Sequence, residues 1–200
     1  DILTILDPEN YYSPERLTAA LEIFGELKKK GRIGFLGASS HQPSFLAEVM
    51  RRYDCFDTVM VRYNYHLQEA RDVLFPLAKV LDVGVVIMKP FAWPYYGIPF
   101  TRFGPVEGEQ GTYTPAQTCL RWILRSPEVA TVVPGMNDIT ELEENLRAVI
   151  IEEGDIDERV LARYLQVAQS EGKSRLKAML DDPCLDISHY AKRALTQLGE

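Results

Sequence analysis

The chain has few of the residues that build disulfides, metal sites or iron–sulfur clusters. Its 200 residues include three histidines, His41, His66 and His189, and three cysteines, Cys55, Cys119 and Cys184. The cysteines are odd in number and show no C-x-x-C spacing, which argues against a disulfide framework, a zinc site or an iron–sulfur cluster. The histidines have no metal-ligand spacing. We therefore expect no metal centre, and we expect Cys119 to be a small core residue.

Long apolar runs and basic clusters are also missing. No apolar run is long enough to span a bilayer, and no signal peptide is recognisable. The net charge is −7, and the longest basic run, 28–30, closes a predicted helix, where cations suit the helix dipole. These features argue against a membrane protein and against nucleic acid as a partner, and they favour a cytoplasmic protein. The sequence also opens directly in a strand, so we expect it to be a piece of something longer.

What the chain does contain is an alternation of apolar strands and amphipathic helices. Near-continuous apolar runs predict buried strands at Ile2–Leu6, Ile33–Gly37, Thr58–Tyr63, Val85–Met88 and Ala130–Val133. Helices are predicted at 14–31, 43–53, 69–81, 114–125 and 138–149. This order is typical of consecutive βα units with a parallel sheet, an α/β fold. Five units do not close a (β/α)8 barrel, so either the sheet is open or three units are missing from the front.

A long segment after the fourth strand interrupts the spacing. It is rich in proline, glycine and aromatic residues, among them Trp93, Tyr95, Tyr96, Phe100 and Phe103. A loop of this length at the carboxyl end of a strand is either a substrate lid or a surface excursion that covers the fold.

The stretch 132–149, VVPGMNDITELEENLRAV, carries the most information about function. The strand breaks at Pro134 and Gly135, and Asn137 or Asp138 can cap the helix that follows. The apolar positions of that helix are Ile139, Leu142, Leu146 and Val149. Such a turn presents unpaired backbone N–H groups and a positive helix end, which suit a phosphate. An ordinary strand–turn–helix unit with a solvated acidic face fits the same pattern.

In their order and spacing, the segments resemble the aldo-keto reductase family over residues 1–152. The matching pieces are GRIGFLGASSH (31–41), TVMVRYNYHLQEARDVLFPLAK (58–79), VGVVIMKPFA (83–92), TPAQTCLRWILRSPEVATVVPG (114–135) and NDITELEENLRA (137–148). The resemblance implies an incomplete (β/α)8 TIM barrel, its last five βα units, that binds NADPH across its carboxyl-end face and reduces aldehydes or ketones by hydride transfer. The segments GASSH (37–41) and IMKP (87–90) resemble those of a bacterial branch of the family. Relatives in that branch often carry a ferredoxin-like cysteine tail, which this chain lacks.

The resemblance leaves the catalytic residues outside this chain. The family's proton-donating Tyr, with its Lys and Asp, belongs to the first three units and is expected upstream of Asp1. The family's His ends the fourth strand, and Leu6 stands at that position, followed by Asp7 and Pro8. We therefore expect the fragment itself to be inactive.

The resemblance places several cofactor contacts within the chain. Ser39 matches the serine that bonds the nicotinamide carboxamide, and Ser40 stands where asparagine is usual. Met60 replaces a glutamine and lacks its amide. Met88 stands where many members stack a tyrosine on the nicotinamide ring. Lys89 and Pro90 follow, and Lys89 could reach the pyrophosphate.

The adenosine end is matched by the stretch 135–145. Gly135, Met136 and Asn137 match the turn that holds the adenosine phosphate, and Glu144 and Asn145 match the pair that reads the adenine edge. Glu141 stands where NADPH-preferring members often have arginine, and a carboxylate repels a 2′-phosphate. The expected cofactor is NADP, with NAD left open.

After the barrel-like part, residues 153–200 form a helical carboxyl-terminal extension. The final part resembles a HEAT-like helix pair, with apolar positions Leu176, Leu180, Ile187, Ala191, Ala194, Leu195 and Leu198. A single repeat cannot bury its own apolar face, so this pair either caps the barrel or binds a protein partner.

Three hypotheses follow. The first is the carboxyl-terminal part of an NAD(P)H-dependent oxidoreductase, for which the aromatic loop suggests an apolar carbonyl substrate. The second is a non-catalytic barrel that acts as a nucleotide-binding or partner-binding scaffold, which Leu6 favours. The third is a truncated product that does not fold stably alone, because a barrel fragment exposes two unpaired strand edges.

Overall fold

The computed structural model describes two compact units. The described residues are 1–91, 113–150, 159, 161–163, 166, 173–174, 176–181, 183, 188, 191–192 and 194–196. The first unit comprises 1–92 and 122–135, and the second comprises 93–121 and 136–200. Most of the aromatic loop, residues 92–112, and parts of the tail, 153–200, lie outside the described residues. The predicted boundary at 152/153 stays a prediction.

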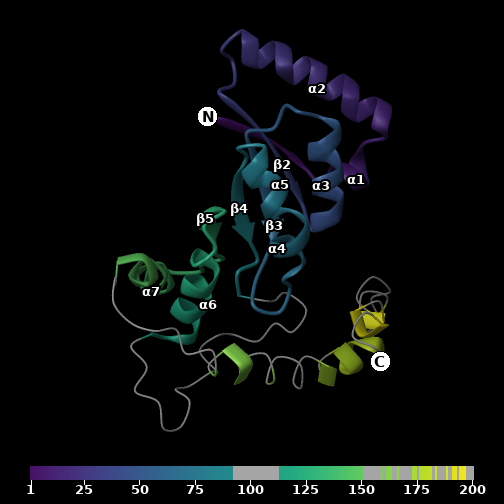
Figure 1. Ribbon diagram of the computed structural model, residues 1–200. Coiled ribbons are helices and arrows are strands. Elements are labelled where there is room, and N and C mark those ends of the chain that lie inside the picture. Colours follow the sequence, from purple (N-terminus) through teal and green to yellow (C-terminus); the bar gives the residue numbers. More distant parts are fainter. Residues whose placement is uncertain are drawn as a thin grey trace. The chain divides into compact units, whose positions relative to one another are not determined.

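The first unit is built on a parallel sheet with the strand order β1-β2-β3-β4-β5 (Figure 1). The strands are β1 (Ile2–Leu6), β2 (Phe35–Ser40), β3 (Thr58–Arg62), β4 (Gly84–Met88) and β5 (Val129–Val133). Each strand pairs with the next one along the chain, which is the arrangement that consecutive right-handed βα units produce. The α/β prediction is confirmed, and β1 and β5 form the two edges of an open sheet.

The second strand differs from its prediction. It extends to Ser40, three residues past the apolar run, because Ser39 pairs with Leu6 on one side and Ser40 pairs with Val61 on the other. Hydropathy ends a strand at its last apolar residue, whereas a ladder between two neighbours continues through polar residues. The two serines therefore lie within the strand and not after it.

Helices connect the strands. The helices of the first unit are α1 (Pro8–Tyr11), α2 (Pro14–Lys29), α3 (Pro43–Arg52), α4 (Glu69–Val73) and α5 (Phe75–Val80). The Ser13 hydroxyl accepts the Arg16 N–H at 3.4 Å, which confirms the predicted cap of α2. The single helix predicted over 69–81 is two helices, because Pro76 has no N–H to donate and its ring disfavours a continuous helix. The short α1 was not predicted.

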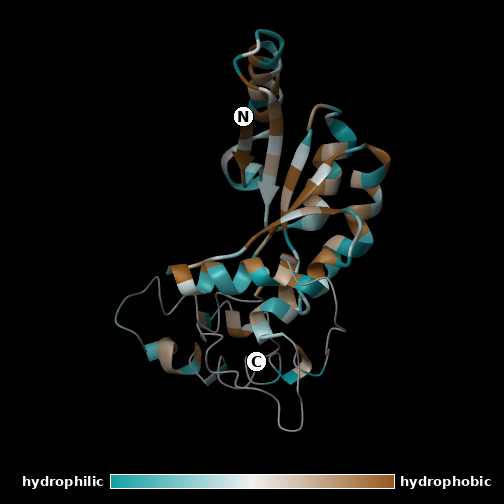
Figure 2. Ribbon diagram, turned by 90° about the vertical axis from the view of Figure 1, so that its left-hand side faces the viewer, coloured by the Kyte–Doolittle hydropathy of each residue, from teal (hydrophilic) through white to brown (hydrophobic). Residues whose placement is uncertain are grey.

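Burial differs from strand to strand in the sheet. On β3 and β4 the alternate residues Val59, Val61, Val85 and Ile87 are fully buried in the core, while the residues between them are half-buried. The strands stand out as hydrophobic segments in Figure 2. Apolar side chains also remain exposed on the strands, with Leu6 63% and Phe35 52% exposed. The prediction of strands buried on both faces is confirmed for β2, whose residues 36–40 are all buried. It is wrong for β1, β3, β4 and β5 in the described structure, because an open five-stranded sheet encloses no barrel interior.

The second unit contains α7 (Ile139–Ile150), a 3₁₀ turn (Met179–Asp181) and most of α6 (Pro115–Leu124). Helices α6 and α7 are joined by the Gln117 side chain, whose Nε2 donates to the Glu144 carbonyl at 3.0 Å. Cys119 is buried on α6, as predicted. In the tail, a buried apolar cluster joins Leu176, Ala191, Ala194 and Leu195. This grouping agrees with a helix pair, although Leu180 is 40% exposed, and Ile187 and Leu198 lie outside the described residues.

The predicted apolar stripe of α7 does not face the core. Ile139 is 66%, Leu146 50% and Val149 67% exposed, whereas Asn145 and Ala148 are buried. That side of the helix faces α6, because the Arg121 guanidinium also donates to the Ala148 carbonyl at 3.0 Å. Two polar side chains of α6 thus select the buried face of α7, which hydrophobic periodicity does not detect. No described helix has the length and apolarity to cross a membrane.

Candidate cofactor-binding site

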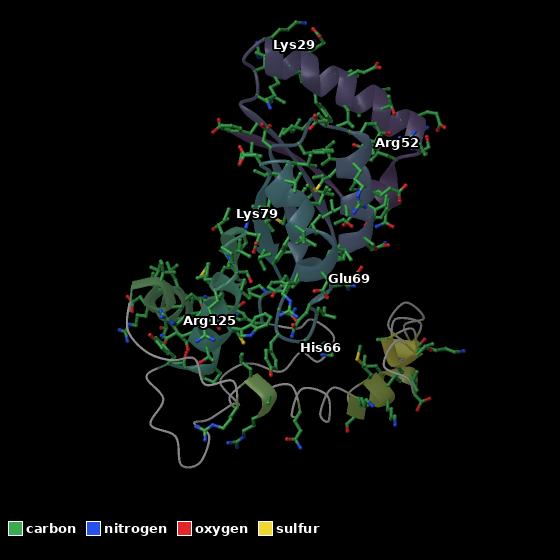
Figure 3. The ribbon with its side chains drawn as sticks, viewed as in Figure 1. Lys29, Arg52, His66, Glu69, Lys79 and Arg125 are labelled. Carbon is green, nitrogen blue, oxygen red and sulfur yellow. The ribbon has the colours of Figure 1, made fainter. Side chains whose placement is uncertain are left out.

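The predicted nicotinamide-side residues gather at one edge of the sheet. In a parallel sheet all carboxyl ends meet at the same edge, which is where ligands of α/β proteins bind. Ser39 and Ser40 end β2, Met88 ends β4, and Ser39 pairs directly with Met60 of β3. Figure 3 shows His66, which follows β3, at the end of the sheet opposite Lys29, the last residue of α2.

Ser40 is already occupied by protein groups. It is fully buried, its hydroxyl donates to the Glu9 carboxylate in a short hydrogen bond, and it accepts the Gln42 N–H at 2.9 Å. A hydroxyl has one proton, so Ser40 has no donor left for a carboxamide while Glu9 is in place. Its assignment as a cofactor contact stays a prediction that requires Glu9 to move. No signal in the sequence near Ser40 indicated Glu9, which lies 31 positions earlier in the chain.

Ser39 is likewise held by the segment after β1. The Asp7 N–H donates to the Ser39 carbonyl at 2.7 Å, and Ser39 is 4% exposed. Asp7 has φ 39°, a left-handed conformation that is uncommon for residues other than glycine. The His41 ring lies 3.4 Å from the Asp7 carboxylate. Asp7, which follows β1, therefore contacts both the end of β2 and the loop after it.

Leu6 has no group that could donate a proton. It ends β1, it is aliphatic, and it is 63% exposed. Tyr63 follows β3 but is also unsuited as an acid, because it is buried against Phe75 and Trp122, with ring centroids 4.9 and 5.2 Å away. Burial raises the pKa of its phenol, in part offset by a hydrogen bond with Ser126. Neither residue supplies the chemistry that carbonyl reduction needs.

Lys89 and Pro90 follow β4 in a fixed conformation. Lys89 is exposed with φ 58°, and Pro90 is buried. The buried Asn64 amide donates to the Lys89 carbonyl at 2.9 Å and accepts the His66 and Leu67 N–H groups at 3.0 and 2.8 Å. Asn64 therefore sets the backbone from which Lys89 projects. It lay inside the segment used for the family resemblance, but nothing in its spacing singled it out.

The predicted phosphate turn lies at 135–137. Gly135, Met136 and Asn137 are exposed, and no atom lies within 4 Å of the position a Gly135 Cβ would take. The Asn137 N–H, however, donates to the Glu141 carboxylate at 2.7 Å, and the Asn137 side-chain amide contacts the same carboxylate at 3.2 Å. A protein carboxylate thus holds the N–H that the sequence predicted for a phosphate.

The start of α7 is capped as predicted. The Glu141 N–H donates to the Asp138 carboxylate at 2.9 Å, which makes Asp138, and not Asn137, the capping side chain. Glu144 is half-buried and Asn145 is 7% exposed. Asn145 lies on the buried face of α7, so its assignment to the adenine edge stays a prediction that requires this face to open.

The described residues hold no cluster of three or more His, Cys, Asp or Glu side chains that could bind a metal ion. Burial raises the pKa of the Cys119 thiol to about 12, so it remains protonated and inert. Burial also lowers the pKa of His66, which is neutral at pH 7.

Comparisons with known proteins find similarity to aldo/keto reductases. The model of the aldo/keto reductase family matches residues 103–163. A curated relative, a probable aldo-keto reductase 1 from Glycine max, is 21% identical over 182 residues, which cover 76% of this chain and 52% of the relative. The chain therefore spans about half the length of this relative.

Solved structures share the fold. An aldo-keto reductase from Bacillus halodurans in its holo form matches with a TM-score of 0.59 and 21% identity, over 84% of this chain and 60% of that one. An aldo/keto reductase from Brucella melitensis matches with a TM-score of 0.60 and 17% identity, over 82% and 60%. The five-stranded parallel sheet with its helices is thus part of an α/β barrel.

Proposed function

We propose that the chain belongs to the aldo-keto reductase family, which the family-model match and the similar proteins support, and that it is the carboxyl-terminal, nucleotide-binding part of an NAD(P)H-dependent oxidoreductase that reduces aldehydes or ketones. The observation that carries the proposal is the carboxyl edge of the sheet, where Ser39, Met60 and Met88 lie on neighbouring strands and Lys89 follows. When bound there, a nicotinamide would supply the hydride for the carbonyl carbon.

The residues of the chain fit this cofactor in part. Met60 and Met88 offer thioethers that pack against a ring, Lys89 offers an exposed cation, and the turn 135–137 is exposed. Ser40 would contact the carboxamide only after Glu9 moves away. Asn137 would offer its N–H to a phosphate only after Glu141 moves away. The proton donor would come from residues upstream of Asp1.

The first experiment is a titration of the chain with NADH and NADPH, followed by the fluorescence of the reduced nicotinamide. We expect NADH to bind at least as tightly as NADPH, because Glu141 places a negative charge at the turn where a 2′-phosphate would lie. Binding of neither nucleotide would contradict the proposal.

Charge reversal at Glu141 separates the two cofactors. Glu141→Arg should raise the ratio of NADPH to NADH affinity by about tenfold, because an arginine pairs with a phosphate. Glu143→Arg is the matched control, since Glu143 is exposed on the same helix. An NADPH preference above tenfold in the unchanged chain would show that the charge of Glu141 does not decide the cofactor.

A non-catalytic role is the second candidate, and the exposed aliphatic Leu6 favours it. A protein that binds the nucleotide but has no acid at the barrel centre would act as a nucleotide-binding scaffold, with the helical tail as the contact for a protein partner. An assay of the intact protein with aldehydes and NAD(P)H distinguishes the two, because the scaffold binds the cofactor without oxidising it.

A further inference from the structure

The segment that follows β1 lies against the carboxyl end of β2. This segment, residues 7–11, consists of Asp7 and the short helix α1, and we call it the strap. Two contacts fix its start: the Asp7 N–H donates to the Ser39 carbonyl at 2.7 Å, and the Asp7 carboxylate lies 3.4 Å from the His41 ring. The start of the strap therefore cannot leave β2 without breaking both contacts.

Glu9 fastens the middle of the strap. Its carboxylate accepts the Ser40 hydroxyl in a short hydrogen bond, and Ser40 is fully buried. Ser40 ends β2, at the edge of a parallel sheet where ligands of α/β proteins bind. Glu9 takes the only proton that the Ser40 hydroxyl can donate, so a ligand can accept this proton only when the strap is displaced.

Little within the strap itself stabilises its conformation. Asp7 has φ 39°, a left-handed conformation that residues other than glycine rarely adopt. It stands at the N-cap of α1, but its side chain makes no capping hydrogen bond with any described residue and lies beside His41 instead. A helix of four residues is too short to be stable by itself. The contacts with residues 39–41 therefore decide whether the strap is closed.

The closed strap also leaves one polar atom unsatisfied. Glu9 Oε2 is buried and has no hydrogen-bond partner among the described residues. A buried carboxylate oxygen without a donor is unfavourable, because it has lost its hydration and gained no hydrogen bond in return. Opening the strap hydrates this oxygen, which brings the open conformation closer in free energy to the closed one.

We propose that the strap is an autoinhibitory element of the cofactor site: when closed it occupies Ser40 and excludes the nicotinamide carboxamide, and its opening admits the dinucleotide. This role rests on the proposed function, which takes Ser39 and Ser40 as carboxamide contacts. The closed strap lowers the affinity for a dinucleotide in proportion to the fraction of molecules that are open. A ligand with the adenosine diphosphate part but no carboxamide does not compete with Glu9.

The test uses the 200-residue chain and its variants Glu9→Ala and Glu9→Gln. Isothermal titration measures the binding of NADH and of ADP-ribose, which has no nicotinamide. The matched control is Glu48→Ala, where the same change falls on an exposed glutamate of α3. Urea midpoints of all variants show whether the fold is retained.

We expect Glu9→Ala to tighten NADH binding by about tenfold, which corresponds to a strap that is closed in about nine-tenths of the unchanged molecules. The gain should be smaller in Glu9→Gln, because the amide oxygen still accepts the Ser40 hydroxyl. The affinity for ADP-ribose should change by less than about twofold in both variants, since it does not compete with the strap.

Hydrogen exchange followed by NMR gives a readout that needs no nucleotide. The Asp7 N–H is bonded to the Ser39 carbonyl, and the Gln42 N–H is bonded to the Ser40 hydroxyl. Both should exchange at least about threefold faster in Glu9→Ala, because opening of the strap exposes them. The Leu36 N–H, which Asp57 binds near the start of β2, should keep its rate.

The failures are distinguishable. If NADH binds and Glu9→Ala matches Glu48→Ala, or if Glu9→Ala tightens ADP-ribose as much as NADH, the autoinhibition is refuted and the proposed function stands. If exchange of the Asp7 and Gln42 N–H groups is unchanged in Glu9→Ala, Glu9 does not hold the strap and the autoinhibition is refuted. If no variant binds NADH or ADP-ribose, the proposed function fails and the autoinhibition fails with it.

Discussion

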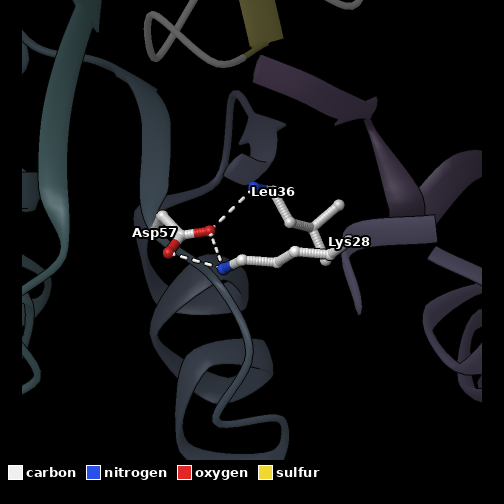
Figure 4. A network of polar contacts seen from close by, with 3 residues as sticks. All are labelled: Lys28, Leu36 and Asp57. Atoms are coloured by element: carbon white, nitrogen blue, oxygen red, sulfur yellow. Dashed lines mark hydrogen bonds and ion pairs between the residues drawn. The ribbon is translucent and has the colours of Figure 1, made fainter. Parts of the chain in front are cut away.

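The amino end of the sheet is held by one carboxylate, and removing it tests how the fold is stabilised. Asp57 accepts the Leu36 N–H at 2.8 Å and the Lys28 ammonium at 2.7 and 2.5 Å (Figure 4). Its own N–H donates to the Leu36 carbonyl at 2.8 Å, and its carbonyl accepts the Gly84 N–H at 2.9 Å. Asp57 thus connects the starts of β2, β3 and β4 and the end of α2.

The backbone hydrogen bond and the ion pair of this network contribute differently to the free energy of unfolding. Leu36 is 2% exposed, and Asp57→Ala would leave its buried N–H without an acceptor, which costs about 1–3 kcal/mol. The Lys28 and Asp57 side chains are 38% and 30% exposed, and a pair this open to solvent contributes about 0–1 kcal/mol. We therefore expect Asp57→Ala to lower the free energy of unfolding by about 2–3 kcal/mol and Lys28→Met by about 1 kcal/mol or less.

Urea unfolding followed by circular dichroism measures both losses, at low salt and in 1 M NaCl. The Lys28→Met effect should shrink in high salt, since the Debye length is then only about 3 Å, while the Asp57→Ala effect should persist. If Lys28→Met costs as much as Asp57→Ala, or if the Asp57→Ala loss vanishes in high salt, the ion pair and not the backbone hydrogen bond is the stabilising element.

The pH dependence gives an independent check. Burial pushes the pKa of Asp57 up, but the hydrogen bonds from Lys28 and Leu36 and the charge of Lys28 together outweigh it, so the pKa lies below its ordinary value of 3.8. A lowered carboxyl pKa stabilises the fold above the unfolded value, and this contribution is lost as the pH falls through the lowered value. The unchanged chain should therefore lose more stability on acidification below about pH 4 than Asp57→Asn does.

Three further predictions concern the rest of the first unit. Gly37→Ala should lower the free energy of unfolding by about 1–3 kcal/mol, because the new Cβ would lie 2.6 Å from the Thr58 hydroxyl. Gly25→Ala should stabilise α2, because no atom lies within 4 Å of the new Cβ and alanine favours a helix. Equal effects of the two variants in thermal melts would contradict this. Asn64→Ala should cost about 2–4 kcal/mol in urea unfolding, because three backbone groups lose a buried partner, and a loss under about 0.5 kcal/mol would show that water replaces the amide. Burial lowers the pKa of His66 below 6.5, so the free energy of unfolding should fall as the pH drops from 6.5 through the lowered pKa. His66→Asn should remove this pH dependence, and an unchanged pH dependence in the variant would assign it to another group.

The fold was largely predictable because its signals are local. Four of the five strands lie within one residue of their predicted bounds at each end, because each is marked by a short, near-continuous apolar run in the sequence. Ser13 and Pro14 also predicted the start of α2 correctly, because a capping side chain bonds to backbone groups within the first helical turn. Pro76 could also have been interpreted correctly, since a proline within a helical pattern breaks it.

The site was less predictable because its contacts are between segments. Nothing near Ser40 in the sequence indicates that Glu9 takes its hydroxyl, and the hydrogen bond of Asn64 spans 25 positions.

From the amino-acid sequence alone we could infer the order of strands and helices, the parallel sheet and the family resemblance, because each depends on periodicity and composition along a short stretch of chain. Tertiary packing sets which groups are free to act. It buried Asn145 and exposed the apolar stripe of α7, because α6 offers polar partners to that side. Side-chain availability depends on which segments meet in space, and local sequence does not specify that.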